Sequence, residues 1–266
     1  MSSLPSRHKL FPFALALTVC ANLSNAGAVF QLDARLNVSL SNAGATLSWQ
    51  ALGTTNAPLL TACGTQWHDT GNGVANISKN AEVGPLLFAG DDATNVWVKS
   101  VVMVVQCAQG GLNMRETIAC GEEIFRLGSK IDGMRNGATT GRPEQGLYSV
   151  ASWKINTLEG ENGVFKAGET ALVEFTFSNP LRLSEIAWGA DFGRKSWKRG
   201  WRGNFKAIIG FSETPSENVL AGTRTYLNTR WQLGLDIPRA TPAQITSAQN
   251  VGVRMQNLYS TLLLIR

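Results

Sequence analysis

The fold of this chain is organised around the stretch Val29-Phe-Gln-Leu-Asp-Ala-Arg-Leu-Asn-Val-Ser-Leu40. Apolar and polar side chains alternate along it, and successive side chains of a strand point to opposite faces, so the pattern predicts a strand with one apolar face. That apolar face comprises Phe30, Leu32, Ala34, Leu36, Val38 and Leu40. Such a strand has two kinds of partner. It pairs within its own sheet as the first strand of a sandwich, or it acts as a donor strand that fills the open groove of a neighbouring molecule.

Residues 1–28 have the pattern of an export signal peptide. Arg7 and Lys9 precede an apolar run, and Ala26-Gly-Ala28 fits the small-x-small cleavage site. We expect cleavage after Ala28 or after Ala26. Because a membrane helix needs about 20 apolar residues and no stretch reaches that length, the sequence predicts no transmembrane segment. The predicted organisation is a signal peptide (residues 1–28), an N-terminal extension (residues 29–41) and a β-sandwich domain with inserted loops (residues 42–266).

Composition limits the class of protein. With 266 residues, 44% hydrophobic and 16% charged, the chain can bury a substantial core. Its formal net charge of +5 is too small to indicate a nucleic-acid partner, and export also disfavours one. Cys63, Cys107 and Cys120 follow the signal peptide, so an exported chain would form one disulfide and leave one cysteine over. We favour Cys107 with Cys120, because that pair closes a short hairpin-like loop.

Short strand patterns separated by turn residues continue along the chain. The unbroken apolar run from Val101 to Val105 indicates a core strand, within residues 96–107, that is covered on both faces. A short helix is expected only at residues 122–127. The other expected strands are residues 45–52, 114–120 (returning antiparallel), 147–155, 164–177, 205–211, 223–235 and 258–266, with residues 237–242 as a connection. Many short strands with almost no helical periodicity predict an all-β sandwich.

The residue types needed for catalysis and metal binding are scarce. His68 is the only histidine after the signal peptide, and no Cys-x-x-Cys accompanies it, so a zinc site is not indicated. A Ser-His-Asp triad would also require His68, but no Gly-x-Ser-x-Gly elbow is present. Glu122 and Glu123 are adjacent and would not converge across a sugar ring as glycosidase carboxylates do. We therefore expect no catalytic residue, no metal and no cofactor.

A cationic aromatic segment occupies residues 188–205, with glycines that favour a loop or hairpin tip. Its candidate ligand-binding residues are Arg194, Lys195, Trp197, Lys198, Arg199, Trp201 and Arg202. Indole rings stack on sugars, and guanidinium groups bind phosphates, sulfates or carboxylates. The segment is therefore a candidate contact for an anionic or glycosylated partner, such as a host glycan. In the alternative interpretation, Trp197 or Trp201 packs beneath the loop while the cations stay solvated.

The order of these features resembles the subunits of chaperone–usher fimbriae, in particular the large kappa-class subunits. In that family a signal peptide precedes an alternating extension, a turn and a Trp-containing strand, matched here by residues 30–40, residues 41–44 and Leu47-Ser-Trp49. The chain departs from the family in its three cysteines and in ending with Arg266 rather than an aromatic residue. The resemblance implies an immunoglobulin-like sandwich that is incomplete and is completed by donor-strand exchange. It also implies binding of a periplasmic chaperone through the final strand, and contacts with neighbouring fimbrial subunits.

Two functions are consistent with these observations. The first is an exported pilus subunit, structural or adhesive and without enzymatic activity, which passes through the periplasm to the fimbrium at the cell surface. The second is a self-contained secreted lectin-like binding module, in which residues 30–40 pair within their own sheet. An exported hydrolase of unrecognised type remains as a third. Folding of the mature chain as a monomer, without a chaperone, separates the first two.

Overall fold

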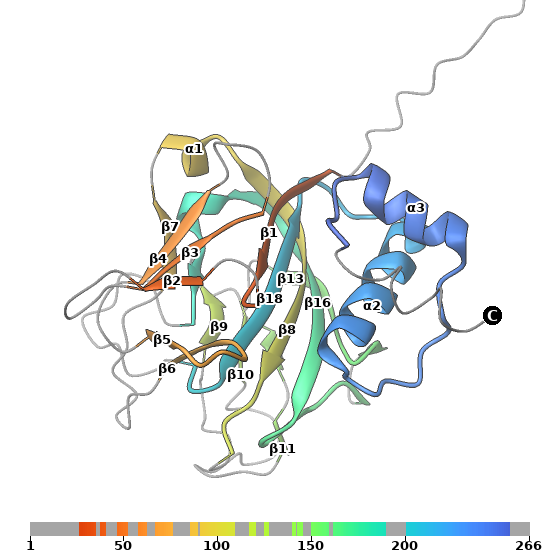
Figure 1. Cartoon of the computed structure of the whole chain (residues 1–266), viewed down its shortest axis with the longest axis horizontal. Helices are drawn as coiled ribbons and strands as arrows, with labels where there is room; N and C mark the ends of the chain where they lie inside the picture. The colour runs from red at the N-terminus through yellow and green to blue at the C-terminus, as the bar shows by residue number, and fades with distance from the viewer. Residues whose placement is uncertain are drawn as a thin grey trace, which may run out of the picture.

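The structure is a computed structural model that describes residues 27–35, 38–40, 47–52, 58–62, 67–76, 86–89, 91–109, 117–120, 125–127, 140–141, 143–145, 150–159, 162–189 and 201–255. Two antiparallel sheets pack face to face, and two helices cover the outer face of one of them (Figure 1). The predicted all-β sandwich is therefore confirmed. Residues 1–26 of the predicted signal peptide and the expected strand at residues 258–266 lie outside the described residues.

The first sheet is built around β8 (Trp97–Gln106), and its Val101–Val105 run is buried as the sequence predicts. The strand order is β14 (Leu158–Glu159), β13 (Val150–Ile155), β16 (Thr170–Arg182), β8, β18 (Asn204–Phe211), β6 (Val74–Asn76) and β5 (Trp67–Asp69), with β1 (Ala28–Asp33) also paired to β18. Both neighbours of β8 pair with it antiparallel. This sheet has one face on the second sheet and the other face on the helices, which explains why the Val101–Val105 run of β8 is apolar on both sides.

The second sheet has the order β12 (Pro143–Gln145), β10 (Phe125–Leu127), β9 (Thr117–Cys120), β17 (Ala187–Trp188), β7 (Leu86–Ala89), β4 (Leu59–Ala62), β3 (Leu47–Gln50) and β2 (Val38–Leu40). Two sequence predictions are corrected here. The expected helix at residues 122–127 contains the strand β10, and β9 pairs with β10 and β17 instead of the core strand β8. β11 (Thr140–Gly141) and β15 (Phe165–Lys166) form a separate pair. The short helical turns α1 (Asp91–Thr94) and η2 (Leu183–Glu185) also lie among the strands.

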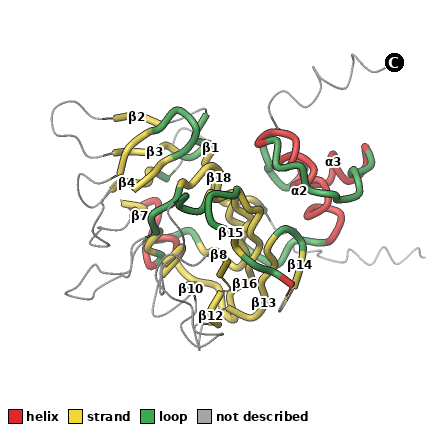
Figure 2. Tube along the Cα trace, turned by 90° about the horizontal axis from the view of Figure 1, so that it is seen from below, coloured by secondary structure: helices red, strands yellow, loops and turns green. Residues whose placement is uncertain are grey.

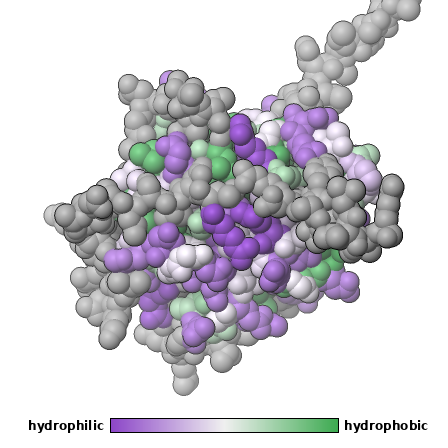
Figure 3. Space-filling model, viewed as in Figure 1, coloured by the Kyte–Doolittle hydropathy of each residue, from purple (hydrophilic) through white to green (hydrophobic). Residues whose placement is uncertain are grey.

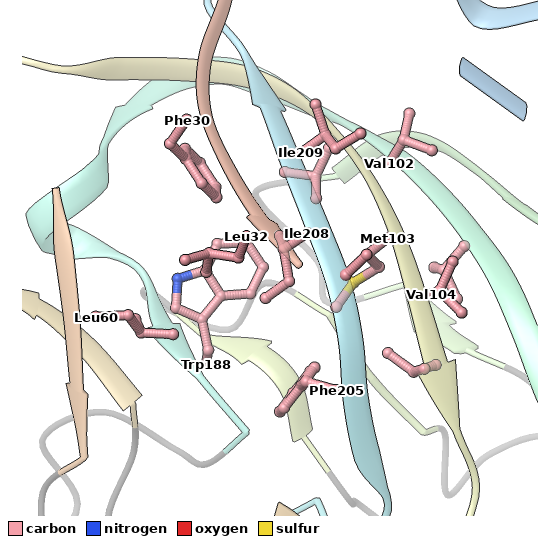
Figure 4. Packing of buried hydrophobic residues seen from close by; sticks show 14 of the residues in the cluster. Phe30, Leu32, Leu60, Val102, Met103, Val104, Trp188, Phe205, Ile208 and Ile209 are labelled. Atoms are coloured by element: carbon pink, nitrogen blue, oxygen red, sulfur yellow. The ribbon is translucent and has the colours of Figure 1, made fainter. Parts of the chain in front are cut away.

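The N-terminal stretch divides between the two sheets. β1 pairs with β18, a turn follows at Ala34 and Arg35, and β2 pairs with β3. Phe30 and Leu32 point into the core (Figure 4). The Phe30 ring centroid lies 4.9 Å from that of Phe88. Phe30 also lies against Gly210 of β18, where any Cβ would overlap the phenyl ring. The predicted alternation therefore holds in β1, although the stretch is not one continuous strand.

Two helices at the C-terminal end form the outer layer, α2 (Glu217–Trp231) and α3 (Pro242–Asn250). They lie together to one side of the strands, as Figure 2 shows. The strand expected at residues 223–235 is therefore wrong for most of its length. Ser216 caps α2 by accepting from the Val219 N–H, and Thr241 and Gln244 form a capping box at the start of α3. Gly222 allows the close approach of the helices, since a Cβ there would overlap the carbonyl of Gln244.

Neither helix, nor any other within the described ranges, is long and apolar enough to cross a membrane.

Candidate functional site

The polar face of β1 is buried against the helical layer. Gln31 and Asp33 are only 2% and 1% exposed. One oxygen of Asp33 accepts from Nε of Arg230 at 3.0 Å and from the Tyr226 hydroxyl at 3.4 Å. The side-chain amide of Gln31 bonds to both backbone groups of Arg254, donating to its carbonyl at 3.0 Å and accepting from its N–H at 2.8 Å. The polar residues that alternate along β1 therefore attach the first strand to the C-terminal segment.

A second buried ion pair joins α2 to the middle of the sheet. Arg224 donates from Nε and Nη2 to the two carboxylate oxygens of Glu174, at 2.7 and 2.8 Å, and its Nη1 also donates to Glu217. Burial lowers the pKa of Arg224, but its hydrogen bonds and charge attraction with Glu174 and Glu217 outweigh burial and raise the pKa above its ordinary value. Because this guanidinium is already satisfied by carboxylates, we assign it a structural role.

Positive charge collects where β1, β18 and the end of α2 meet. We call this the cation cluster, and it consists of Arg35 and Lys206 over the ring of Trp231, together with the neighbouring Arg230. Cζ of Arg35 lies 4.4 Å from the Trp231 ring centroid and Nζ of Lys206 lies 5.3 Å from it. Arg35 also donates to the carbonyl of Arg230 at 2.9 Å. Strongly hydrophilic residues gather near the middle of the face that Figure 3 displays.

Lys206 is the unusual member of the cation cluster. It is only 5% exposed, and its ammonium donates to the backbone carbonyl of Asn72 at 3.1 Å. No ion pair among the described residues includes it. Desolvation by burial, and secondarily the charge of Arg35, lower the pKa of Lys206 below its ordinary value. Lysines are almost never buried without a paired anion, so this position needs an explanation.

The cationic aromatic segment does not expose its second tryptophan. Trp201 is fully buried, its ring centroid lies 5.8 Å from that of Phe165, and its backbone N–H donates to the carbonyl of Gly189 at 2.7 Å. The predicted use of Trp201 as a ligand-stacking ring is therefore corrected, because the indole is a core side chain. Arg202 is partly exposed. Arg194, Lys195, Trp197, Lys198 and Arg199 lie outside the described residues, so their predicted role stays a prediction.

An exposed aromatic and cationic pair occurs instead at the edge of β8. The side chain of Trp97 is 46% exposed, and Cζ of Arg182 lies 5.1 Å from the centroid of its ring. The two residues are register partners across the β8–β16 pairing. Sequence reasoning missed this pair because Trp97 was counted as part of the core strand. The signal available in the sequence was that Trp97 precedes the apolar run, which starts at Val101.

The remaining predicted residues are placed as follows. Among the donor-strand candidates, Phe30, Leu32 and Ala34 are buried in this chain's own core, Val38 and Leu40 lie in β2, and Leu36 is outside the described residues.

Cys107 is buried after β8, whereas the side chain of Cys120 is not described, so their disulfide stays a prediction. His68 is partly exposed in β5, and the described part of the chain holds no group of three or more His, Cys, Asp or Glu suited to a metal ion.

Comparisons with protein-family models, with curated proteins and with solved structures found no match to this chain, so its function is argued from the geometry above.

Proposed function

We propose that the protein is an exported, self-contained β-sandwich that acts by binding a partner and not by catalysis. The observation that carries this proposal is the placement of β1. Phe30 to Asp33 pair antiparallel with Ala207 to Gly210 of the same chain. The apolar face of β1 fills the core, and its polar face bonds to α2 through Asp33 and to the segment after α3 through Gln31. Both faces of β1 are thus covered by its own chain, and this favours a module that folds without a partner.

A fimbrial subunit assembled by donor-strand exchange is the competing proposal, supported by the antiparallel sandwich and the N-terminal position of β1. To serve a neighbour, β1 would have to leave β18. That step exposes Phe30 and Leu32 and leaves Arg230 without the carboxylate of Asp33. Uncovering two large apolar side chains and a buried charge is costly, so the pairing of β1 within its own chain favours the self-contained module.

We expect the mature chain, starting at Gly27, to fold as a monomer without a chaperone. Its melting temperature should not change when a peptide of residues 29–40 is added, because β1 already occupies the place beside β18. Deleting residues 28–35 should abolish folding, because the deletion removes the core packing of one face of β1 and the hydrogen bonds of the other. Light scattering and thermal denaturation measure these results. A chain that folds only with a chaperone or with the added peptide would establish the fimbrial alternative.

The exposed Trp97–Arg182 pair is the surface best suited to the partner. An indole presents a flat apolar face to a sugar ring, and a guanidinium beside it attracts a carboxylate or sulfate. Nearby, Lys99 donates to the carbonyl of Ser178 at 2.8 Å and adds positive charge. The pair therefore favours an acidic glycan as ligand, which is the ligand class expected from the sequence but on different residues.

We expect Trp97→Ala to weaken binding to an acidic polysaccharide by about 1 to 3 kcal/mol, by analogy with aromatic stacking on other ring ligands. Leu158→Ala is the matched control, because Leu158 is a large apolar residue that is 50% exposed on another strand. The control should bind like the unmodified protein in a sulfated and uronic-acid glycan panel. Equal affinities for all three proteins would remove Trp97 from the binding surface.

A further inference from the structure

The cation cluster carries more positive charge than the described residues around it neutralise. Arg35, Lys206 and Arg230 contribute three cations. Asp33 is the one carboxylate in the described part of the chain that forms an ion pair with them, and it binds Arg230. The C-terminal end of α2 adds the equivalent of about half a negative charge. Arg35 uses that end, since it donates to the carbonyl of Arg230 near the helix terminus. Lys206 therefore has no anionic partner of its own among the described residues.

The donors of the cluster are also incompletely used. An ammonium group has three N–H donors, and among the described residues Lys206 donates to the carbonyl of Asn72 alone. The indole N–H of Trp231 is buried and has no acceptor among the described residues. Arg35 is exposed, so the cluster reaches the surface on its side. Buried donors without acceptors are costly, and an added acceptor would remove that cost.

We propose that the cation cluster binds the oxyanion group of an acidic ligand, a carboxylate or a sulfate, between Lys206 and Arg35 beside the ring of Trp231. An oxyanion supplies the missing negative charge together with several acceptor lone pairs. Lys206 provides a charge-assisted hydrogen bond from the buried side, and the planar guanidinium of Arg35 binds from the exposed side. The site shares no residue with the Trp97–Arg182 pair, so it goes beyond the proposed function.

A purely structural role for the cluster gives a different expectation. Cations at the C-terminal end of a helix stabilise it, and Arg35 fits that role. Lys206 does not, because its ammonium pays the cost of desolvation beside another cation. Removing its charge should therefore leave the unliganded protein as stable as before or more stable. A residue that costs stability yet supports binding is typical of a functional site.

Isothermal titration with sodium sulfate and with sodium glucuronate, at ionic strength held constant with chloride, tests the proposal. We expect saturable binding of at least one anion to the full mature protein, and at least a tenfold weaker affinity in Lys206→Met and in Arg35→Met. Lys154→Met is the matched control, because it removes one equal charge from β13, where Lys154 pairs with Glu159 at 2.9 Å. This control should bind like the unmodified protein.

The outcomes of the titration support or overturn the proposal. Binding of sulfate alone, or of glucuronate alone, supports it and identifies the oxyanion that the cluster prefers. No saturable binding of either, or an equal loss in Lys154→Met, overturns the proposal. Circular dichroism establishes that each variant is folded, and the exposed Arg35 position keeps the test available if Lys206→Met does not fold. Failure here leaves the monomer test of the proposed function unaffected, because that test involves no anion.

Discussion

Replacing Arg224 by methionine is expected to lower the free energy of unfolding by about 3 to 5 kcal/mol. The side chains of Arg224 and Glu174 are 10% and 9% exposed, and the guanidinium binds both carboxylate oxygens. Without Arg224, the charge of Glu174 stays buried beneath α2 with no cation to neutralise it. Urea denaturation of the mature protein and of Arg224→Met measures the difference.

Two further variants test whether the lost stability comes from the unpaired buried charge of Glu174. In the double variant Glu174→Leu with Arg224→Met, both charges are replaced by apolar groups, and most of the lost stability should return. Glu217→Gln should cost less than about 1 kcal/mol, because the Glu217 side chain is 70% exposed. If Arg224→Met unfolds at the same urea concentration as the unmodified protein, α2 is not anchored by this pair.

Replacing Trp201 by alanine is expected to cost about 3 to 5 kcal/mol of folding stability. Trp201 is fully buried against Phe165, and its backbone bonds to Gly189 and to the side chain of Asn76. Truncation leaves a cavity the size of an indole, which the surrounding strands cannot fill. Chemical denaturation of Trp201→Ala gives the change in unfolding free energy.

The same substitution at Trp97 is the control for Trp201. Trp97→Ala should change the free energy of unfolding by less than about 1 kcal/mol, because the side chain is 46% exposed and loses mainly its contact with Arg182. We therefore expect Trp201→Ala to lose folding stability, and Trp97→Ala to lose ligand binding while its stability is nearly unchanged. A stable Trp201→Ala protein that no longer binds a glycan would restore the original interpretation of the cationic aromatic segment.

The sequence predicted the sandwich well because the central strand β8 contains an uninterrupted apolar run. The run from Val101 to Val105 identifies β8, and the alternation of Phe30 and Leu32 places them in the core. The same alternation predicts that Asp33 faces away from the core. It does not reveal that this second face is also covered, because Asp33 pairs with Arg230 of α2 and Gln31 bonds to the backbone of Arg254, both far away in the sequence.

The helix α2 was missed for a physical reason. Threonines, two aromatic residues and Gly222 give it a low intrinsic helix propensity, so the segment looks like a strand. It is stabilised by its contacts, among them the pairs of Arg224 with Glu174 and of Arg230 with Asp33. For α3 a local signal was present, the capping box of Thr241 and Gln244 with a proline at the first turn. The cation cluster brings together residues from the turn after β1, from β18 and from α2, and no short motif encodes such a site.

The pairing of β1 with β18 also sets the order in which the chain can fold. Phe30 cannot pair with β18 until Gly210 has been synthesised. At about 5 to 20 residues per second this takes roughly 10 to 40 seconds. Until then the apolar face of the first strand has no partner from the central sheet. Contacts between residues so far apart in the sequence slow folding, because a long loop must close before they stabilise the chain. A backbone hydrogen bond between Ala28 and Val251 joins β1 to the segment after α3, so this contact also forms only after most of the described residues have been synthesised.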